Sequence, residues 1–515
     1  MNKTNGQKMS GVMLNAYPDS MGGNLTQLIK VLKQSEFEDC FSLFYVLPTF
    51  FNSDLDRGFS IIDYDLNSSL VSDQDLKDLK DLHIELKFDI VLNHLSVASP
   101  QFKDLLQNGK NSKFKDFFIN WNEFWEGHGE LNKDGIIIPE EKYLSKLFMR
   151  KSGLPILEVE FPDGSKQPYW NTFYQKISVD ENGNKRYLGQ MDVNAKSELV
   201  WDFYDQTLKK LSEYGCKILR LDAFAYLHKE VGLSNFFNES GTWDHLQRIR
   251  SLADQYHLSL LPEIHAEYGQ GLHKQVADKD YTIYDFFLPG LCIHTIETAS
   301  SSALKKWILE IQAEGYRTVN MLGCHDGIPV LDLKGLLSDE QIQKVMDTIL
   351  DRGGMVKNLY DADGNKISYY QINATYYSAL GENDQKMLLA RAIQLFTPGI
   401  PQIWYLDLFG GTNDYKAVEE GGSGAHKEIN RTNLTSEEMK DRLKSELVVK
   451  QLQLIQLRNT SSAFLGTMTL VDTEDQFLHI KWENENDLIE LIADLNTYNF
   501  EIRFLHNGDL KSYHY

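Results

Sequence analysis

The chain has 515 residues, of which 42% are hydrophobic and 24% charged, a composition typical of a globular protein with one large domain and smaller attached ones. The formal net charge is −22, so we expect neither nucleic acid nor an anionic membrane as a partner. The polar N-terminus and the lack of an apolar run near the roughly 18 residues that span a bilayer predict a cytoplasmic protein.

Four cysteines, Cys40, Cys216, Cys292 and Cys324, lie far apart in the sequence and form no zinc-binding spacing. Reduced, mostly buried thiols are therefore the expected state.

Eight short apolar runs are typical of strands, and several lack alternation, as strands buried on both faces do. In chain order they span 12–19, 40–50, 88–96, 217–226, 258–268, 282–290, 318–327 and 399–407. Amphipathic stretches at 72–83 and 198–214 predict helices between them. About eight alternations of strand and helix predict an α/β fold, a (β/α)8 TIM barrel.

Two connections are too long for plain helical crossovers and predict domains inserted in loops at the catalytic face. Beyond about residue 440, a helix-like stretch (439–459) precedes alternating segments that predict a small C-terminal β domain. We divide the chain into barrel segments 1–94, 198–327 and 386–440, inserted domains 95–197 and 328–385, and a C-terminal β domain 441–515.

Polar residues lie at the C-terminal ends of four predicted strands, which is where a barrel of this kind places its active site. These residues are Asn93 and His94, Arg220 and Asp222, Glu263 and His265, and His325 and Asp326. One such residue alone would most often be a satisfied polar group of the core. Four strand ends that converge on one opening predict a site, because buried charges are costly unless they are paired.

The carboxylates predict cleavage of a glycoside, which needs one ionised carboxyl group and one protonated carboxyl group on either side of the bond. Arg220, two residues before Asp222 on a strand, points to the same face and is expected to keep that aspartate ionised. Glu263 follows an apolar run, and desolvation there would raise its pKa and suit it to general acid catalysis.

Metal binding is a competing interpretation. His94, His265 and His325 could be ligands beside Asp222, but the sequence contains no HxH or HExxH spacing that would support them.

DIVLNH (89–94), RLDAFAY (220–226), LPEIHAEY (261–268) and CHDG (324–327) resemble the four signature regions of the α-amylase family of glycoside hydrolases and transglucosidases. RGFSIIDY (57–64), ARAIQLFTPGIPQ (390–402) and EINR (428–431) resemble its sucrose phosphorylase branch. The likeness extends from about residue 12 to about 470.

The resemblance implies a retaining mechanism with Asp222 as nucleophile, Glu263 as acid/base and Asp326 as stabiliser of the transition state. It implies a β-glucosyl ester on Asp222 and release of α-D-glucose 1-phosphate after attack by phosphate. The other substrate-binding residues that it implies are Asp56, Phe59, His94, Phe173, Gln190, Arg220, Tyr226, His265, His325, Tyr370, Gln371 and Lys427.

Phosphate needs positive charge in an acidic protein, and Arg150 and Lys151 in the first insertion are the candidates; solvated surface charge is the alternative for this pair. The α-amylase family often holds calcium in this insertion, but the phosphorylase branch generally does not. We predict no metal or other cofactor, small-molecule partners only (an α-glucoside and inorganic phosphate), and a monomer or homodimer.

The sequence departs from the family pattern at several places, which we expect to surround the acceptor side and not the glucose pocket. Lys427 stands where an arginine is usual, and a lysine cannot make the same bidentate contact. The leaving group is therefore left open among fructose, fructose 6-phosphate, glycerol and glycerate. Tyr370 disfavours fructose 6-phosphate, because the family members that use it have a histidine there.

Three hypotheses follow. The first is a phosphorylase for sucrose or a close α-glucoside, and the second is a hydrolase or transglucosidase with the same catalytic residues. A barrel without activity, used as a sugar-binding or scaffold protein, is the third, but the presence of all three carboxylates argues against it.

Overall fold

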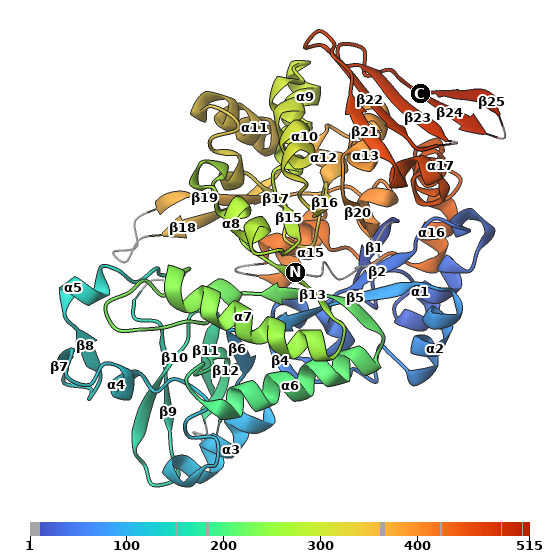
Figure 1. Cartoon of the computed structure of the whole chain (residues 1–515). Helices are drawn as coiled ribbons and strands as arrows, with labels where there is room; N and C mark the ends of the chain where they lie inside the picture. The colour runs from blue at the N-terminus through green and yellow to red at the C-terminus, as the bar shows by residue number, and fades with distance from the viewer. Residues whose placement is uncertain are drawn as a thin grey trace.

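The computed structural model describes residues 11–150, 153–181, 185–360, 366–422, 425–485, 487–506 and 508–515, with the backbone alone for 357–360, 366–370 and 506. Figure 1 shows the whole chain.

Eight parallel strands form a nearly closed barrel, which confirms the predicted fold. Their order is β14-β13-β5-β2-β1-β20-β16-β15, and the two end strands, β14 and β15, lie next to each other. The strands are β1 (Met13–Ala16), β2 (Leu43–Val46), β5 (Glu85–Val91), β13 (Cys216–Asp222), β14 (Ser259–Pro262), β15 (Ile283–Asp285), β16 (Thr318–Met321) and β20 (Ile400–Trp404). Every one of the eight predicted runs overlaps one of these strands, and six of the runs contain the whole strand. Their side chains are almost all buried, as expected for strands covered on both faces.

Helices pack around this sheet. The main ones are α1 (Leu25–Leu32), α2 (Asp73–Asp81), α6 (Glu198–Glu213), α7 (Glu239–Gln255), α8 (Leu272–Asp278), α9 (Leu288–Thr298), α10 (Ser302–Glu314) and α13 (Asp384–Phe396). The predicted helices 72–83 and 198–214 correspond to α2 and α6. A capping box between Ser72 and Asp75 starts α2, and α6 buries Tyr204, Leu208 and Leu211 at helical spacing. In the described part of the chain, no helix is both long and apolar enough to cross a bilayer.

The first insertion builds a small unit with a core of its own. It contains α3 (Pro100–Asn108), α4 (Trp121–Phe124), β7 (Gly129–Leu131), β8 (Ile137–Pro139), α5 (Glu141–Leu144), β9 (Ile156–Glu160), β10 (Lys166–Trp170), β11 (Gln175–Val179) and β12 (Lys185–Asp192). Trp121, Trp125 and Trp170 pack together at its centre. Its strand β12 pairs with β6 (His94–Ser96), so the insertion is joined directly to the end of barrel strand β5.

Three further strands and two helices follow β16. They are β17 (Ile328–Pro329), α11 (Asp339–Asp351), β18 (Met355–Tyr360), β19 (Lys366–Asn373) and α12 (Tyr376–Ala379). Between β2 and β5, β3 (Phe51–Ser53) and β4 (Ile61–Leu66) form a hairpin. After β20 come α14 (Tyr405–Leu408) and α15 (Tyr415–Gly421).

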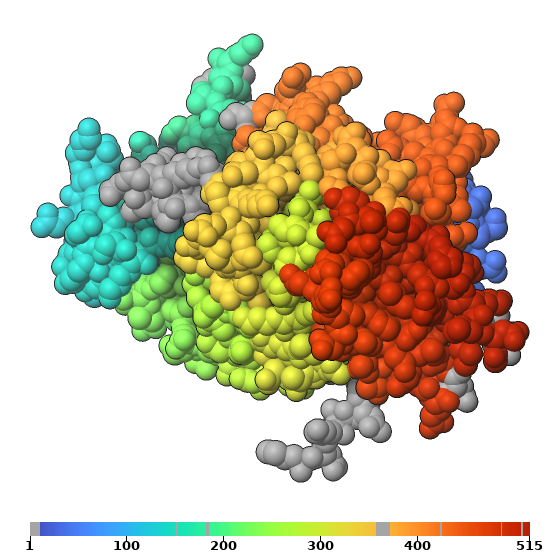
Figure 2. Space-filling model, turned by 90° about the horizontal axis from the view of Figure 1, so that it is seen from above, coloured from blue at the N-terminus to red at the C-terminus, as the bar shows by residue number. Residues whose placement is uncertain are grey.

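The C-terminal region is an antiparallel five-stranded meander, which the alternating pattern predicts. Its strands are β21 (Thr467–Leu470), β22 (Phe477–Glu483), β23 (Leu488–Asp494), β24 (Phe500–His506) and β25 (Asp509–His514). The helix-like stretch before it is two helices, α16 (Ser436–Arg442) and α17 (Glu446–Thr460), because the backbone at Ser445 is extended. In Figures 1 and 2, this sheet and the first insertion lie at opposite ends of the molecule.

All four cysteines are buried and free, as predicted.

Candidate active site

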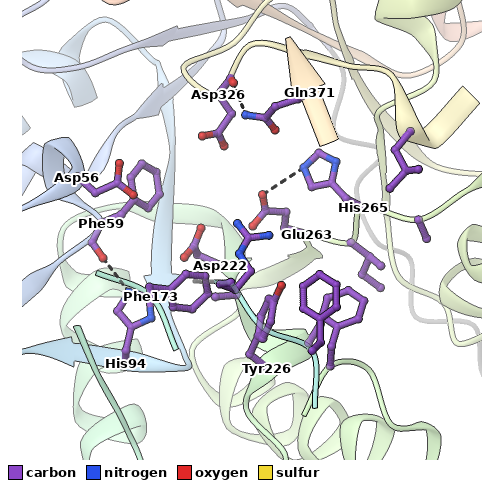
Figure 3. Close-up of a pocket in the computed structure, with 18 of the residues that line it drawn as sticks. Asp56, Phe59, His94, Phe173, Asp222, Tyr226, Glu263, His265, Asp326 and Gln371 are labelled. Atoms are coloured by element: carbon purple, nitrogen blue, oxygen red, sulfur yellow. Dashed lines mark hydrogen bonds and ion pairs between the residues drawn. The ribbon is translucent and has the colours of Figure 1, made fainter. Parts of the chain in front are cut away.

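A cavity of about 250 Å³ opens at the C-terminal ends of the barrel strands, where the sequence predicts the site. The predicted residues that line it are Asp56, Phe59, His94, Arg150, Phe173, Gln190, Asp222, Tyr226, Glu263, His265, His325, Asp326, Gln371 and Lys427. Figure 3 shows Asp222 and Glu263 near the middle of this cavity, with Asp56 on one side and His265 on the other. We refer to these two sides as the Asp56 side and the His265 side.

Arg220 lies beneath the cavity and connects its carboxylates. Its Nη1 atom lies 2.6 Å from Asp89 and 3.0 Å from Asp222, and its Nη2 atom lies 2.6 Å from Glu263. Arg220 and Asp222 project to the same face of β13, as the two-residue spacing predicts, and the guanidinium is almost fully buried. One arginine thus holds the two carboxylates proposed to act on the substrate.

The electrostatic roles predicted for Asp222 and Glu263 are reversed in this substrate-free site. Burial raises the pKa of Asp222 well above its usual value, because the neighbouring carboxylates oppose the effect of Arg220. Burial alone would raise the pKa of Glu263 too, but Arg220 and His265 lower it to about 2. The prediction was wrong because the sequence places Arg220 beside Asp222 only, whereas the fold also brings its guanidinium to Glu263.

On the Asp56 side, two cations lie against two aspartates. Lys427 Nζ lies 2.5 Å from Asp326 Oδ1 and 3.9 Å from Asp56. Arg431, which is buried, lies within 4.0 Å of both aspartates. Burial alone would raise the pKa of Asp326, but His325 and Lys427 hold it well below its usual range. Lys427, expected from the sequence near the acceptor, contacts Asp326 with its ammonium and faces Asp56.

A strained turn places Asp56. Asp56 and Arg57 both have left-handed backbone angles, with φ of 47° and 49°, and Gly58 follows with φ of 109°. A side chain at Gly58 would come within 2.5 Å of the Thr49 nitrogen. Consecutive residues in this region of φ are costly and cluster at functional sites.

Aromatic rings and histidines form the wall next to Asp222. Phe59 stacks on His325 with ring centroids 4.9 Å apart, and the His94 ring lies 5.0 Å from that of Phe173. The carbonyl of Phe59 makes hydrogen bonds with His94 Nε2 at 3.0 Å and with Gln190 at 3.2 Å. His94 Nδ1 is buried without a hydrogen-bond partner.

The His265 side combines aromatic rings with positive charge. His265 lies 3.6 Å from Glu263 and 3.4 Å from Asp332, and it stacks on Phe286. Burial alone would lower the pKa of His265, but the two carboxylates raise it to about 9, so the ring is cationic at neutral pH. The Arg150 guanidinium carbon lies between two rings, 5.6 Å from the centroid of Phe173 and 5.9 Å from that of Tyr226.

Gln371, on β19, donates a hydrogen bond to the backbone carbonyl of Asp326. The predicted residues Lys151 and the side chain of Tyr370 lie outside the described residues. The sequence reasoning missed the cavity residues Phe148, Phe236, Gln270 and Leu331 and the positioning carboxylate Asp332. Phe148 stands two residues before Arg150, which is the only signal that the sequence offered.

The alternative of a metal site is not supported by the arrangement of the histidines. His94 contacts the Phe59 carbonyl, His325 stacks on Phe59, and His265 pairs with Asp332. Over the described ranges, no group of three or more His, Cys, Asp or Glu side chains has the geometry to hold a metal ion.

Comparison with known proteins identifies the family. The chain is 58% identical over 503 residues to the sucrose 6(F)-phosphate phosphorylase of Ilumatobacter coccineus, with 96% of each chain covered. The chain belongs to the sucrose phosphorylase branch of the α-amylase family. It is 34% identical to the sucrose phosphorylase of Streptococcus mutans, with 97% of this chain and 98% of the relative covered.

The fold agrees with this membership of the sucrose phosphorylase branch. The crystal structure of the sucrose 6F-phosphate phosphorylase from Thermoanaerobacter thermosaccharolyticum superposes with a TM-score of 0.87 at 34% identity and covers 98% of this chain and 97% of its own. No family model matches the chain. As a member of this branch, the protein is an enzyme, a glycoside phosphorylase.

Proposed function

We propose that the protein cleaves sucrose 6(F)-phosphate with inorganic phosphate and releases α-D-glucose 1-phosphate, through a covalent glucosyl intermediate on Asp222. The observation that carries the mechanism is the pair of carboxylates, Asp222 and Glu263, on one buried guanidinium at the bottom of a cavity. The 58% identity to an enzyme named for sucrose 6(F)-phosphate supports this substrate.

The glucosyl unit is proposed to occupy the Asp56 side. Its hydroxyl groups would meet the carboxylates of Asp56 and Asp326 and the ammonium of Lys427, all of which reach the cavity. Charged partners make strong hydrogen bonds to hydroxyl groups. His94 would meet another hydroxyl group, and the rings of Phe59 and Phe173 would cover the sugar.

In the first step, an Asp222 oxygen would attack the anomeric carbon while the bond from that carbon to the fructosyl oxygen breaks. Glu263 would give its proton to the departing oxygen. This step needs Asp222 ionised and Glu263 protonated, whereas in the substrate-free site the pKa of Asp222 is raised and that of Glu263 is lowered.

We infer that substrate binding moves the proton. A sugar inserted beside Glu263 would weaken its contact with Arg220, and burial would then raise the pKa of Glu263. Arg220 would remain bound to Asp222 and Asp89, so the negative charge would settle on the nucleophile. The same guanidinium would thus serve both carboxylates in turn.

In the second step, a phosphate oxygen would attack the anomeric carbon, and the ester bond to Asp222 would break. Phosphate and the phosphorylated fructosyl group both need cations, and two that line the cavity would supply them, the Arg150 guanidinium and the His265 imidazolium. Lys151, which follows Arg150 in the sequence, is a further candidate.

Unphosphorylated sucrose is the second candidate substrate, favoured by Tyr370, since the family members that use fructose 6-phosphate have a histidine there. The test is a set of initial rates with α-glucose 1-phosphate and, separately, fructose, fructose 6-phosphate, glycerol and glycerate. The proposal expects the highest kcat/KM with fructose 6-phosphate. Glucose release from sucrose 6(F)-phosphate that is independent of added phosphate would instead indicate a hydrolase.

A further inference from the structure

Lys229 is a buried lysine that does not itself line the cavity but lies directly behind its wall. It is 5% exposed and follows the short helical turn 224–226 after strand β13. Its ammonium group lies 2.8 Å from Asp192 Oδ2, donates to Asn93 Oδ1 at 2.8 Å and donates to the Tyr226 carbonyl at 2.7 Å. An ammonium has three donors, and all three are used.

The oxygens around Lys229 are themselves fixed by further hydrogen bonds. Asp192 Oδ2 also accepts from the Asn93 amide at 2.9 Å, and its two oxygens accept from the Thr172 hydroxyl and backbone nitrogen at 2.6 and 2.8 Å. Burial alone would raise the pKa of Asp192, but Lys229 and Thr172 lower it, so the carboxylate stays ionised. A buried charge pair of this kind is held by complete satisfaction of its hydrogen bonds.

Each segment bound to Lys229, directly or through Asp192, carries a residue of the cavity wall. Asn93 precedes His94, Thr172 precedes Phe173, and the third oxygen belongs to Tyr226 itself. The Phe173 ring lies 5.0 Å from His94 and 5.2 Å, edge to face, from Tyr226. Figure 3 shows these three side chains together along one edge of the cavity. They come from three different parts of the chain, strand β6, the first insertion and the turn after β13.

We propose that the Lys229 ammonium is an internal cation, ligated by three oxygens, that positions His94, Phe173 and Tyr226 as one wall of the site. Lys229 is thus a positioning residue for the reaction and touches no substrate. It joins the first insertion to the barrel at the point where the wall is built. Removal of its side chain would leave an anionic, oxygen-lined space suited to a small ammonium ion.

The chain offers a matched control in Lys305 of helix α10. Its ammonium also has three acceptors, the Thr473 carbonyl at 3.0 Å, the Thr473 hydroxyl at 2.9 Å and the Glu474 carbonyl at 3.3 Å. These contacts fasten the C-terminal domain to the barrel, and Lys305 does not line the cavity. Lys305→Ala therefore removes an equivalent set of contacts without touching the proposed wall.

The experiment compares Lys229→Ala and Lys305→Ala by thermal unfolding and by kinetics with α-glucose 1-phosphate. Each measurement is made with and without n-propylammonium, which replaces the deleted Cγ, Cδ, Cε and Nζ atoms. Misplaced binding groups cost on the order of 10- to 100-fold, so we expect KM of Lys229→Ala to rise at least about tenfold. Both variants lose thermal stability, but KM of Lys305→Ala stays within about twofold of the wild type. Propylammonium restores both the KM and the stability of Lys229→Ala, whereas tetramethylammonium, which has no N–H donors, restores neither.

An unchanged KM in Lys229→Ala, or equal recovery with both ammonium ions, would overturn the proposal. If Lys229→Ala does not fold, Lys229→Gln, which keeps amide donors, takes its place. We expect Lys229→Gln to fold and to have a raised KM, and a wild-type KM in this variant would overturn the proposal. The kinetic part rests on the proposed function. Recovery of thermal stability by propylammonium does not, so failure of the glucose 1-phosphate assay in the wild type can be distinguished from failure of the Lys229 site.

Discussion

The Nη2 atom of Arg220 lies 2.6 Å from Glu263 Oε1, in a place where both side chains are largely buried. This contact, together with His265, lowers the pKa of Glu263 to about 2 against the effect of burial. The proposed general acid is therefore ionised in the empty site. Binding of the sugar has to separate this pair before the acid can act.

The Arg220–Glu263 pair makes stability depend on acidity. The folded pKa of Glu263 is about 2 and the unfolded one 4.5, so the stabilisation is present above pH 4.5 and is lost as pH falls toward 2. We expect the free energy of unfolding of the wild type to fall by up to about 3 kcal/mol more than that of Glu263→Gln between pH 6 and pH 2. Urea unfolding along this range measures it, with exposed Glu36→Gln as control; parallel curves for the wild type and Glu263→Gln would contradict the assignment.

The two carboxylates should respond differently to amide substitution. Asp222→Asn is expected to lose at least about 10³-fold in kcat with every donor, because no nucleophile remains. Glu263→Gln should lose activity with natural α-glucosides but keep much of it with α-glucosyl fluoride, whose leaving group needs no proton. Full activity of Glu263→Gln on sucrose or its phosphate would show that Glu263 is not the acid.

Lys427 should act through glucose affinity. Its ammonium is 2.5 Å from Asp326, so Lys427→Ala leaves a largely buried aspartate with less positive charge beside it. We expect KM for α-glucose 1-phosphate to rise about tenfold or more, while the preference among acceptors stays unchanged. Lys416→Ala, which removes an exposed lysine paired with Glu420, serves as control. A changed acceptor preference with unchanged glucose affinity would return Lys427 to the acceptor side.

Asp332 should control the charge of His265. Asp332 and Glu263 raise the pKa of His265 from 6.5 in the unfolded chain to about 9 in the folded protein. The cationic ring therefore stabilises the fold fully below pH 6.5, and this stabilisation is lost as the pH rises through 9. Asp332→Asn is expected to lower the His265 pKa, which NMR titration of the ring can measure. The Arg220–Glu263 pair and the Glu267–Lys334 pair are the other charges nearby, and neither is changed by this substitution. An unaltered His265 titration would rule out this role of Asp332.

Arg150 should decide how well a phosphate group is recognised. Arg150→Ala is expected to raise KM for fructose 6-phosphate at least about tenfold and KM for fructose much less, because a charge-assisted contact of roughly 1.5–3 kcal/mol is lost. Lys146→Ala, an exposed change that removes a contact with the Gly232 carbonyl, is the control. Equal effects on both acceptors would assign Arg150 to inorganic phosphate alone.

The sequence by itself determined the barrel and the place of the site. Eight apolar runs that alternate with amphipathic stretches predict an enclosed parallel barrel, in which the polar residues that end β5, β13 and β14 meet at one opening. The pairing of Arg220 with Asp222 followed from the two-residue period of a strand.

Only the tertiary structure determined which charged side chains of the site lie next to one another. The contact of Arg220 with Glu263, the position of Lys427 beside Asp326, and the Lys229 cluster each join residues from separate strands or loops. A pKa depends on burial and on neighbours a few ångströms away, and no local pattern in the sequence contains those distances. The strands could be predicted from the spacing of apolar residues along the sequence. The protonation states of the site residues depend on all the charged groups that surround them in the folded protein.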